Sequence, residues 1–401
     1  MQLKSHNFTR MQDLQELFLL DKDITFLNFG SFGACPRPVF EQYQAYQLEL
    51  EKQPVSFIVE KAPIYLKQSR EALATYINCK SGDLVYVTNP SYAVNIVAKS
   101  FALKAGDEVL TTSLEYGACD RTWQLVCEQA GATYKQQAIA LPIVDEAQIV
   151  DQLFAGVTDR TKLIFISHIT SSTALILPVD KIIARAKQLQ IPVFVDGAHA
   201  PGHIDLDLTA LDADYYCGAC HKWMMTPKGS SFLYAKTALH ESLDPLVVSW
   251  GYKDFPSTGS KLVDYHELQG TRDVSAMLCI PAALDFMKQH DWPTVSQKCK
   301  QLVYQYAPII ANTLGSEALA PVNNSFIGQM ISLPIATTDP MGLKKHLLNK
   351  YSIEIPIMQL GQRTFIRYSF NGFNTEADLQ KLQKALEGII ADGNLANLYT
   401  S

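Results

Sequence analysis

The sequence lacks the features that mark several large classes of protein. In 401 residues there is no basic run longer than Lys344-Lys345-His346, and the formal net charge is −6, so nucleic-acid binding is not expected. No stretch approaches eighteen apolar residues, and the first residues lack an apolar signal core, which predicts a soluble, cytoplasmic protein without a membrane segment. No Gly-x-Gly-x-x-Gly opens a helix after a strand, so an NAD-binding sheet is not indicated.

Cysteine is also sparse. The eight cysteines are too few for this length to indicate a secreted disulfide framework. Cys217-Gly218-Ala219-Cys220-His221 fits the pattern for covalent haem attachment, but that chemistry requires export, so we interpret the match as a coincidence. A zinc site would need a second cysteine pair at suitable spacing, and none is evident; no metal site is predicted.

The composition is that of a compact globular protein, and the chain is long enough for two domains. Hydrophobic residues make up 47% and charged residues 18%, which argues against long disordered segments. A chain of this length exceeds what one hydrophobic core usually serves. We predict an amino-terminal helix and linker over 1–25, a large domain over 26–273 and a small domain over 274–401.

The predicted elements alternate between apolar strands and helices. Strands are expected at 83–89, 108–112, 161–166, 193–195, 214–216, 230–235, 326–333, 353–357 and 364–369, and helices at 37–78, 90–103, 340–350, 376–392 and from 274 onward. In the helix over 37–78 we expect core positions at Leu48, Leu50, Val55, Leu66 and Leu73.

Two of these strands end on residues that carry chemistry. The run Val193-Phe194-Val195 reads as a strand buried on both faces and stops at Asp196. A second apolar-aromatic run, Asp214-Tyr215-Tyr216, leads into Lys222. Open α/β sheets bind ligands at the carboxyl ends of their strands. An acid and a lysine meeting there suit pyridoxal phosphate (PLP), which needs an amine for its Schiff base and a carboxylate at its ring nitrogen. By themselves the two residues are equally compatible with a surface lysine and a helix-capping aspartate.

The surrounding residues decide between these alternatives. DGAHAPGH, followed by ADYYCGACHKWMMTPKGSSFLYA, resembles the cofactor segment of the class V, fold-type I PLP enzymes, and among them the isopenicillin N epimerase-like group. The resemblance implies an α/β fold with a mainly parallel seven-stranded sheet in the large domain and a smaller α+β carboxyl-terminal domain. It implies PLP as cofactor, with Lys222 rather than Lys228 as the Schiff-base lysine and Asp196 on the ring nitrogen.

Further motifs extend the resemblance to the phosphate end of the cofactor. The junction between strand 83–89 and the helix from Pro90 presents free N–H groups and the positive end of the helix dipole. Ser91 could simply cap this helix, but the family holds the PLP phosphate here, which implies roles for Ser91 and Tyr92, and His221 is expected to donate to the same phosphate. Gly270-Thr271 matches a family turn that reaches the neighbouring subunit's phosphate, and so implies a homodimer; the alternative is a plain surface turn.

The ring itself has its own expected contacts. The family places an aromatic side chain flat against the pyridine, and here the position holds Tyr116, which could otherwise be a core tyrosine. Thr170, Ser171 and His199 are the residues expected near the phenolic oxygen. His168 is expected to be a core histidine.

The substrate should be an amino acid. Arg367 matches the family's carboxylate-binding arginine, with Arg363 as the surface alternative, and would pair with the substrate α-carboxylate through two hydrogen bonds. The residues Phe26 to Gly33 read as a Gly-rich turn that a regular helix would not tolerate; its likeness to a family motif implies a substrate contact at Asn28. Trp250 is expected to line the same pocket.

The reaction begins with removal of the Cα proton by Lys222 and then branches to epimerisation, β-elimination or transamination. We predict an epimerase of the isopenicillin N epimerase type, with a C–S lyase or an aminotransferase as the alternatives. The stretch 350–362 contains no cysteine, which argues against a persulfide-forming desulfurase. Epimerisation needs a second acid opposite Lys222, for which Tyr116, Tyr92 and Tyr252 are candidates.

Overall fold

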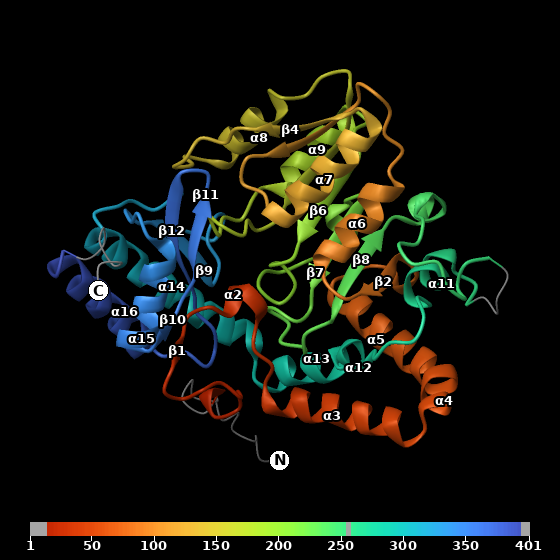
Figure 1. Ribbon diagram of the computed structural model, residues 1–401, viewed down its shortest axis with the longest axis horizontal. Coiled ribbons are helices and arrows are strands. Elements are labelled where there is room, and N and C mark those ends of the chain that lie inside the picture. Colours follow the sequence, from red (N-terminus) through yellow and green to blue (C-terminus); the bar gives the residue numbers. More distant parts are fainter. Residues whose placement is uncertain (1–13, 254–257, 394–401) are drawn as a thin grey trace, which may run out of the picture.

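The fold is seen in a computed structural model that describes residues 14–253 and 258–393 (Figure 1). A seven-stranded sheet in the order β2-β8-β7-β6-β5-β3-β4 forms its centre. β8 is antiparallel to both neighbours, and the other adjacent pairs are parallel. The strands are β2 Leu84–Val87, β3 Glu108–Thr112, β4 Thr133–Gln137, β5 Thr161–Ser167, β6 Val193–Gly197, β7 Tyr215–Ala219 and β8 Ser231–Ala235.

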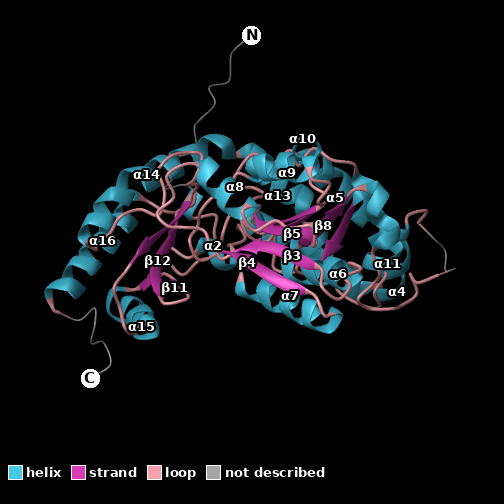
Figure 2. Ribbon diagram, turned by 90° about the horizontal axis from the view of Figure 1, so that it is seen from above, coloured by secondary structure: helices cyan, strands magenta, loops and turns pink. Residues whose placement is uncertain are grey.

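Helices cover both faces of this sheet (Figure 2). On one face Phe194 packs with side chains of α6 and α7, whereas Val193 and Val195 point to the other face, toward α5, α9 and α13. Because consecutive strand residues point to opposite faces, an apolar run buries itself in both layers. The helices of this part are α3 Arg37–Lys52, α4 Pro54–Ser56, the π-helical turn η1 Phe57–Lys61, α5 Ala62–Tyr76, η2 Ser81–Asp83, α6 Pro90–Ser100, α7 Gly117–Ala130, α8 Glu146–Phe154, α9 Val179–Gln188, α10 Leu208–Leu211, η3 Thr237–Ser242, α11 Lys261–Glu267, α12 Ser275–Leu278 and α13 Ile280–Gln289.

The carboxyl-terminal part carries a second, antiparallel sheet in the order β11-β12-β9. α14 and α16 pack beside it, and the two-residue strand β1 pairs in parallel with β10 (Figure 1). The first described strand therefore pairs with a strand of the carboxyl-terminal part of the chain. The elements are β1 Thr25–Phe26, α14 Trp292–Thr313, β9 Met330–Pro334, α15 Pro340–Tyr351, β10 Ile353–Glu354, β11 Ile357–Leu360, β12 Arg363–Ser369 and α16 Glu376–Ala391.

The expected architecture, a mainly parallel seven-stranded sheet with a smaller carboxyl-terminal α+β part, is confirmed. Several element bounds were wrong. The single helix predicted over 37–78 is divided into α3, α4, η1 and α5, and the helix from 274 into α12 and α13. The strand predicted from Phe326 begins at Met330, and the helix predicted to Leu103 ends at Ser100. The domain bounds stay a prediction, and most of the helix predicted over 1–25 lies outside the described residues.

Two of the expected core positions were also wrong. Leu66 and Leu73 are buried, but Leu48 is 56% and Val55 is 76% exposed. The break between α3 and α5 changes the helical phase, so the spacing that fits the core in α5 does not continue back into α3.

The Gly-rich turn after β1 is helical, contrary to the prediction. Phe29–Phe32 form the single turn α2, which ends at Gly33 with φ of 66°. A Cβ at Gly33 would lie 2.2 Å from the carbonyl oxygen of His221, so only glycine fits at this contact. Gly33 therefore allows the end of α2 to pack closely on the turn that holds Lys222.

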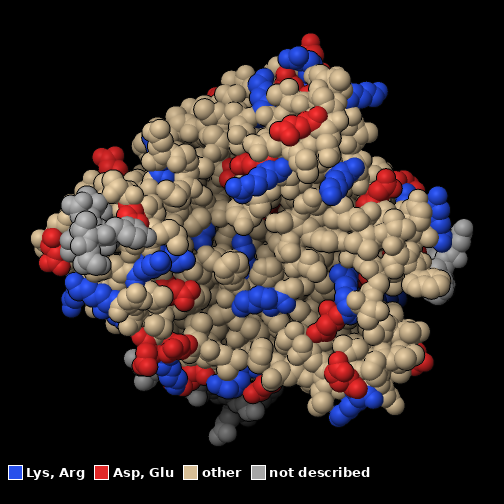
Figure 3. All heavy atoms as spheres, viewed as in Figure 1, with Lys and Arg blue, Asp and Glu red and all other residues tan. Residues whose placement is uncertain are grey.

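The face seen in Figure 3 carries Lys and Arg side chains interspersed with Asp and Glu, without a large patch of one sign. Within the described ranges, no helix has both the length and the apolar character needed to cross a bilayer.

Candidate active site

A cavity of about 640 Å³ lies at the carboxyl ends of the parallel strands. β6 brings Asp196 and His199 to it, the turn after β7 brings His221 and Lys222, and β12 of the small sheet brings Arg367. The crevice thus combines an acid, an amine and a guanidinium from three strands, as the Asp196–Lys222 spacing predicts. The other lining residues are Gly30, Ser31, Phe32, Thr88, Asn89, Pro90, Ser91, Tyr116, Cys119, Ser167, Ile169, Ser171, Ala198, Gly229 and Met358.

Lys222 is the nucleophile that this geometry offers. Burial, followed by the positive charge of Arg367, lowers the pKa of Lys222 to about 8. Its Nζ lies 3.2 Å from Nε2 of His199. Because an amine attacks an aldehyde only in its neutral form, the lowered pKa makes Lys222 reactive near neutral pH.

Asp196 is held by three donors. Its Oδ1 accepts the backbone N–H of Ala198 at 3.0 Å and lies 3.5 Å from Sγ of Cys217, and its Oδ2 lies 3.5 Å from Sγ of Cys119. Burial raises the pKa of both thiols well above the ordinary value, so both sulfurs stay protonated and can donate.

Cys217 and Cys220 are fully buried, which is incompatible with haem attachment.

Arg367 lies in the same cavity but comes from the small sheet. Its Nη1 donates to the backbone oxygen of Ser171 at 2.7 Å and its Nη2 to Oγ of Ser31 at 2.9 Å. Its Nε is buried and has no hydrogen-bond partner among the residues that the structure describes. Burial lowers the pKa of Arg367 to about 10, so the guanidinium remains charged at neutral pH and can bind a carboxylate.

The turn between β2 and α6 closes the other end of the cavity. Asn89 caps α6 by accepting the N–H of Tyr92 at 2.9 Å, and Ser91 lines the cavity beside it. His221 lines it too, with its Nδ1 3.0 Å from the backbone oxygen of Ser230. Since a carbonyl only accepts, Nδ1 carries the proton, and Nε2 donates to a phosphate only when the ring is cationic. Burial lowers the pKa of His221 to about 4, so this donation needs the phosphate's own charge.

Five of the predicted site residues do not line this cavity. Thr170 is buried and bonds to Thr173, Tyr92 donates to Gln269 at 3.1 Å, and Trp250 is 72% exposed. Asn28 accepts the hydroxyl proton of Ser31 and so supports Ser31, which in turn contacts Arg367. The fifth, Thr271, is described next. The other eight predicted site residues line the cavity: Ser91, Tyr116, Ser171, Asp196, His199, His221, Lys222 and Arg367.

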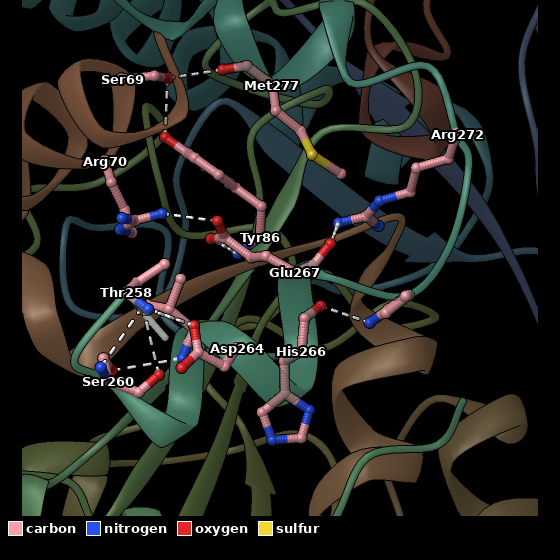
Figure 4. A network of polar contacts seen from close by, with 12 residues as sticks. Ser69, Arg70, Tyr86, Thr258, Ser260, Asp264, His266, Glu267, Arg272 and Met277 are labelled. Atoms are coloured by element: carbon pink, nitrogen blue, oxygen red, sulfur yellow. Dashed lines mark hydrogen bonds and ion pairs between the residues drawn. The ribbon is translucent and has the colours of Figure 1, made fainter. Parts of the chain in front are cut away.

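Thr271 is exposed on a turn that a buried ion pair holds in place (Figure 4). At the end of α11, the carboxylate of Glu267 accepts from Nη1 of Arg70 at 2.6 Å and from the backbone N–H of Tyr86 at 3.0 Å. Arg272 donates to the backbone oxygen of Glu267 at 3.4 Å. The turn is therefore fixed to α5 and β2, while Thr271 is exposed and does not line the cavity of its own chain.

One residue that sequence reasoning missed is Glu115. It is buried, its Oε2 accepts the backbone N–H of Ser167 at 2.8 Å, and Oγ of Ser167 and of Thr112 also donate to its carboxylate. Burial, with a further contribution from the negative charge of Asp196, outweighs these donors and raises the pKa of Glu115 to about 7. Its position beside Tyr116 after a buried strand was the available signal.

We expect Glu115 to make the cofactor-free protein less stable as pH rises from about 4.5 to 7, because the folded state binds its proton more tightly than the unfolded state. The shift corresponds to roughly 3 kcal/mol. Glu115→Gln should remove that loss of stability. The melting temperature of Glu115→Gln minus that of wild type should therefore increase between pH 5 and pH 7.5. Calorimetry at several pH values measures this, with Glu128→Gln, an exposed position of α7, as control. Parallel pH curves for wild type and Glu115→Gln would contradict it.

The residues present fit PLP. The cavity volume lies within the range of cofactor sites. An amine of lowered pKa and a fixed carboxylate face the same space, and the first turn of α6 offers an anion site. Within residues 14–253 and 258–393 the buried Nε of Arg367 has no partner, as expected of a group that meets a ligand. Within the described ranges, no cluster of His, Cys, Asp and Glu could hold a metal ion.

Comparison with known proteins agrees with this geometry. The family model for aminotransferase class-V matches residues 33–382. The chain belongs to this family. It is 32% identical over 392 residues to the isopenicillin N epimerase of Amycolatopsis lactamdurans, covering 94% of this chain and 98% of that relative. It is 26% identical to a probable chloroplastic L-cysteine desulfhydrase of Arabidopsis thaliana, covering 93% of this chain and 84% of that one.

The fold matches solved structures of the same kind. The apo structure of a cysteine desulfurase from Thermococcus onnurineus NA1 superposes with a TM-score of 0.80 at 19% identity, covering 95% of this chain and 98% of that one. The family and its structural neighbours depend on PLP. This class-V chain is therefore an enzyme of a PLP-dependent family whose members typically act on amino acids.

Proposed function

We propose that this class-V protein binds PLP through Lys222 and removes the Cα proton of an amino acid, as an epimerase of the isopenicillin N epimerase type. One observation carries the proposal: a partly buried lysine of lowered pKa lines the same cavity as a fixed carboxylate and a buried arginine. PLP, when bound, would withdraw electrons from Cα and so make the Cα proton acidic.

The chain's own residues then divide the work. Asp196, held by two thiols and a backbone N–H, keeps the ring nitrogen protonated. Arg367 binds the α-carboxylate and orients the Cα–H bond toward Lys222. The neutral amine of Lys222 takes the proton as general base, and its pKa of about 8 lets it give the proton back.

The second acid that an epimerase needs has one candidate at this cavity. Tyr116 lines it and is 47% exposed, whereas Tyr92 bonds to Gln269, and neither Tyr92 nor Tyr252 lines the cavity. We therefore assign Tyr116 both the ring contact and the hydroxyl that returns a proton to the opposite face of Cα.

C–S lyase activity is the second candidate, supported by the similarity to the L-cysteine desulfhydrase. β-Elimination needs the same base and no second acid on the opposite face. The segment from Lys350 to Gln362 contains no cysteine, which supports elimination over persulfide formation. Transamination would need return of the proton to the cofactor and hydrolysis by water to release a keto acid, and is the third outcome.

We also propose a homodimer in which Thr271 completes the neighbouring site. Its exposure, together with the Glu267–Arg70 pair that fixes the turn, suits a donor offered to a second copy. A two-fold axis would complete both sites at once.

The reaction is tested by incubating the PLP-loaded protein in deuterated water with a panel of amino acids. We expect deuterium at Cα and formation of the opposite enantiomer without release of pyruvate or ammonia. Pyruvate from cysteine or cystine would establish the lyase instead, and conversion to the pyridoxamine form would establish the aminotransferase. Absence of deuterium exchange with every amino acid would contradict the proposal as a whole.

A further inference from the structure

His199 lies between the reactive lysine and a tryptophan. Its Nε2 is 3.2 Å from Nζ of Lys222, and its Nδ1 is 3.4 Å from Nε1 of Trp223. Trp223 and His199 are buried, only 1% and 3% exposed, and Lys222 is partly buried beside them. An indole nitrogen donates and never accepts, so Nδ1 of His199 is the acceptor of this bond and carries no proton.

We propose that Trp223, with His203 behind it, is a positioning residue that holds His199 in the tautomer with its proton on Nε2, directed at the amine of Lys222. In this arrangement every hydrogen bond runs in one direction, from indole to imidazole to amine. An amine accepts from Nε2 only through its lone pair, which it has only when neutral. The two hydrogen bonds that run from Trp223 through His199 therefore favour the neutral form of Lys222.

His203 fixes the other side of the indole. Its ring stacks on Trp223 with the ring centres 3.7 Å apart and the planes inclined by 17°. Its Nε2 accepts the backbone N–H of Gln329 at 2.7 Å, and its Nδ1 donates to the backbone oxygen of His199 at 3.0 Å. Because a backbone N–H only donates and a carbonyl only accepts, His203 has a single possible tautomer.

Close packing leaves the side chains of His203 and Trp223 little freedom to rearrange. A Cβ at Gly328 would lie 2.3 Å from Nε2 of His203, and one at Gly202 would lie 2.5 Å from the backbone oxygen of Trp223. Gln329 immediately precedes β9, so a strand of the small sheet determines, through His203 and Trp223, the orientation of a ring beside Lys222.

The charges around the pair agree with a neutral His199. Burial, then the positive charges of Lys222 and Arg367, lower the pKa of His199 well below its ordinary value. The titratable and charged groups that face Lys222 and His199 from the packed elements are Arg367, Asp196, Cys119, Cys217, His203 and His221. Neither a cationic His199 nor its Nδ1–H tautomer would leave Nδ1 free to accept from Trp223.

The first test uses the cofactor-free full-length protein labelled with 15N-histidine. The two nitrogens of a neutral imidazole differ in 15N shift according to which carries the proton, and a His199→Gln sample assigns the signals. We expect His199 of wild type to be protonated on Nε2, and Trp223→Phe, which keeps an aromatic ring but loses the donor, to show Nδ1–H as well. A wild-type His199 protonated on Nδ1 would overturn the proposal, even if Trp223→Phe does not fold.

The second test rests on the proposed role of Lys222 and measures the rate at which cofactor-free protein combines with PLP at different pH values. In Trp223→Phe the midpoint of this profile should move upward by about half a pH unit, which slows the reaction about threefold at pH 7. Trp123→Phe is the matched control, since Trp123 is also buried but its indole nitrogen has no hydrogen-bond partner in the described part of the chain. Its midpoint should equal that of wild type.

His203→Ala removes the stacked ring and should shift the midpoint in the same direction as Trp223→Phe. A uniform slowing at every pH with an unmoved midpoint would indicate a purely structural role and overturn the proposal. Failure of PLP to react with Lys222 in wild type, with His199 still protonated on Nε2, would instead refute the proposed function and leave the tautomer assignment intact.

Discussion

Replacing Lys222 by alanine should lower turnover of any amino-acid substrate by about 10⁴-fold, the largest effect expected of a single change in this protein. Among the described residues that line the cavity, Lys222 is the one amine, and in the proposed function it would both bind the cofactor's aldehyde and take a proton from Cα. Steady-state kinetics measures the loss, and the absorbance band at about 400 nm that marks a lysine-bound aldehyde should disappear.

Lys228→Ala is the matched control for this experiment. Lys228 follows Lys222 closely in the sequence, but its Nζ donates to the backbone oxygen of Gly33 at 3.2 Å and does not line the cavity. The absorbance band should persist in Lys228→Ala. If Lys222→Ala kept the band and Lys228→Ala lost it, the assignment of the cofactor lysine would be wrong.

Arg367→Leu should reduce kcat/KM for an α-amino acid by about 10²- to 10³-fold, equivalent to roughly 3–4 kcal/mol of binding to the carboxylate. The loss should appear mainly in KM, because the carboxylate is bound alike before and during proton removal. Arg367→Lys should recover only part of it, since an ammonium group cannot form the two parallel bonds of a guanidinium.

Two comparisons isolate the carboxylate contact. Arg363→Leu changes an exposed arginine at the start of the same strand and should leave KM unchanged. For an amine that lacks the carboxylate, wild type and Arg367→Leu should exchange the proton next to nitrogen at equal rates. An equal loss with this amine would mean that Arg367 supports the fold, through Ser31 and Ser171, and does not bind the substrate.

Local sequence was sufficient to predict the residues that end buried strands. Asp196 and Lys222 follow apolar runs, and parallel strands bring their carboxyl ends to one edge of a sheet whatever the details of packing. Ser91 and Tyr116 follow strands in the same way and also line the cavity. The seven-stranded sheet and the family followed from the same motifs.

Other parts of the prediction failed where the outcome depends on packing between distant segments. The prediction of one helix over 37–78 ignored a break at Gln53. It therefore assigned Leu48 and Val55 to the core, whereas both are exposed. Gly30 and Gly33 were interpreted as a sign of irregular backbone, although Gly30 makes room for Met330 and Ser369 and Gly33 for the turn around His221. Periodicity describes one element at a time and contains no information on what approaches it.

The sequence by itself indicated that Lys222 and Asp196 lie at the same edge of the sheet and that the chain resembles a PLP-dependent family, because strand ends and short motifs are local properties. Only the tertiary structure decided that Arg367 meets Ser171, 196 residues away in the chain, that Glu115 is buried near Asp196, and that Trp223 donates to His199. These contacts depend on how the two sheets pack together and on the direction of single hydrogen bonds, and neither leaves a periodic trace in the sequence.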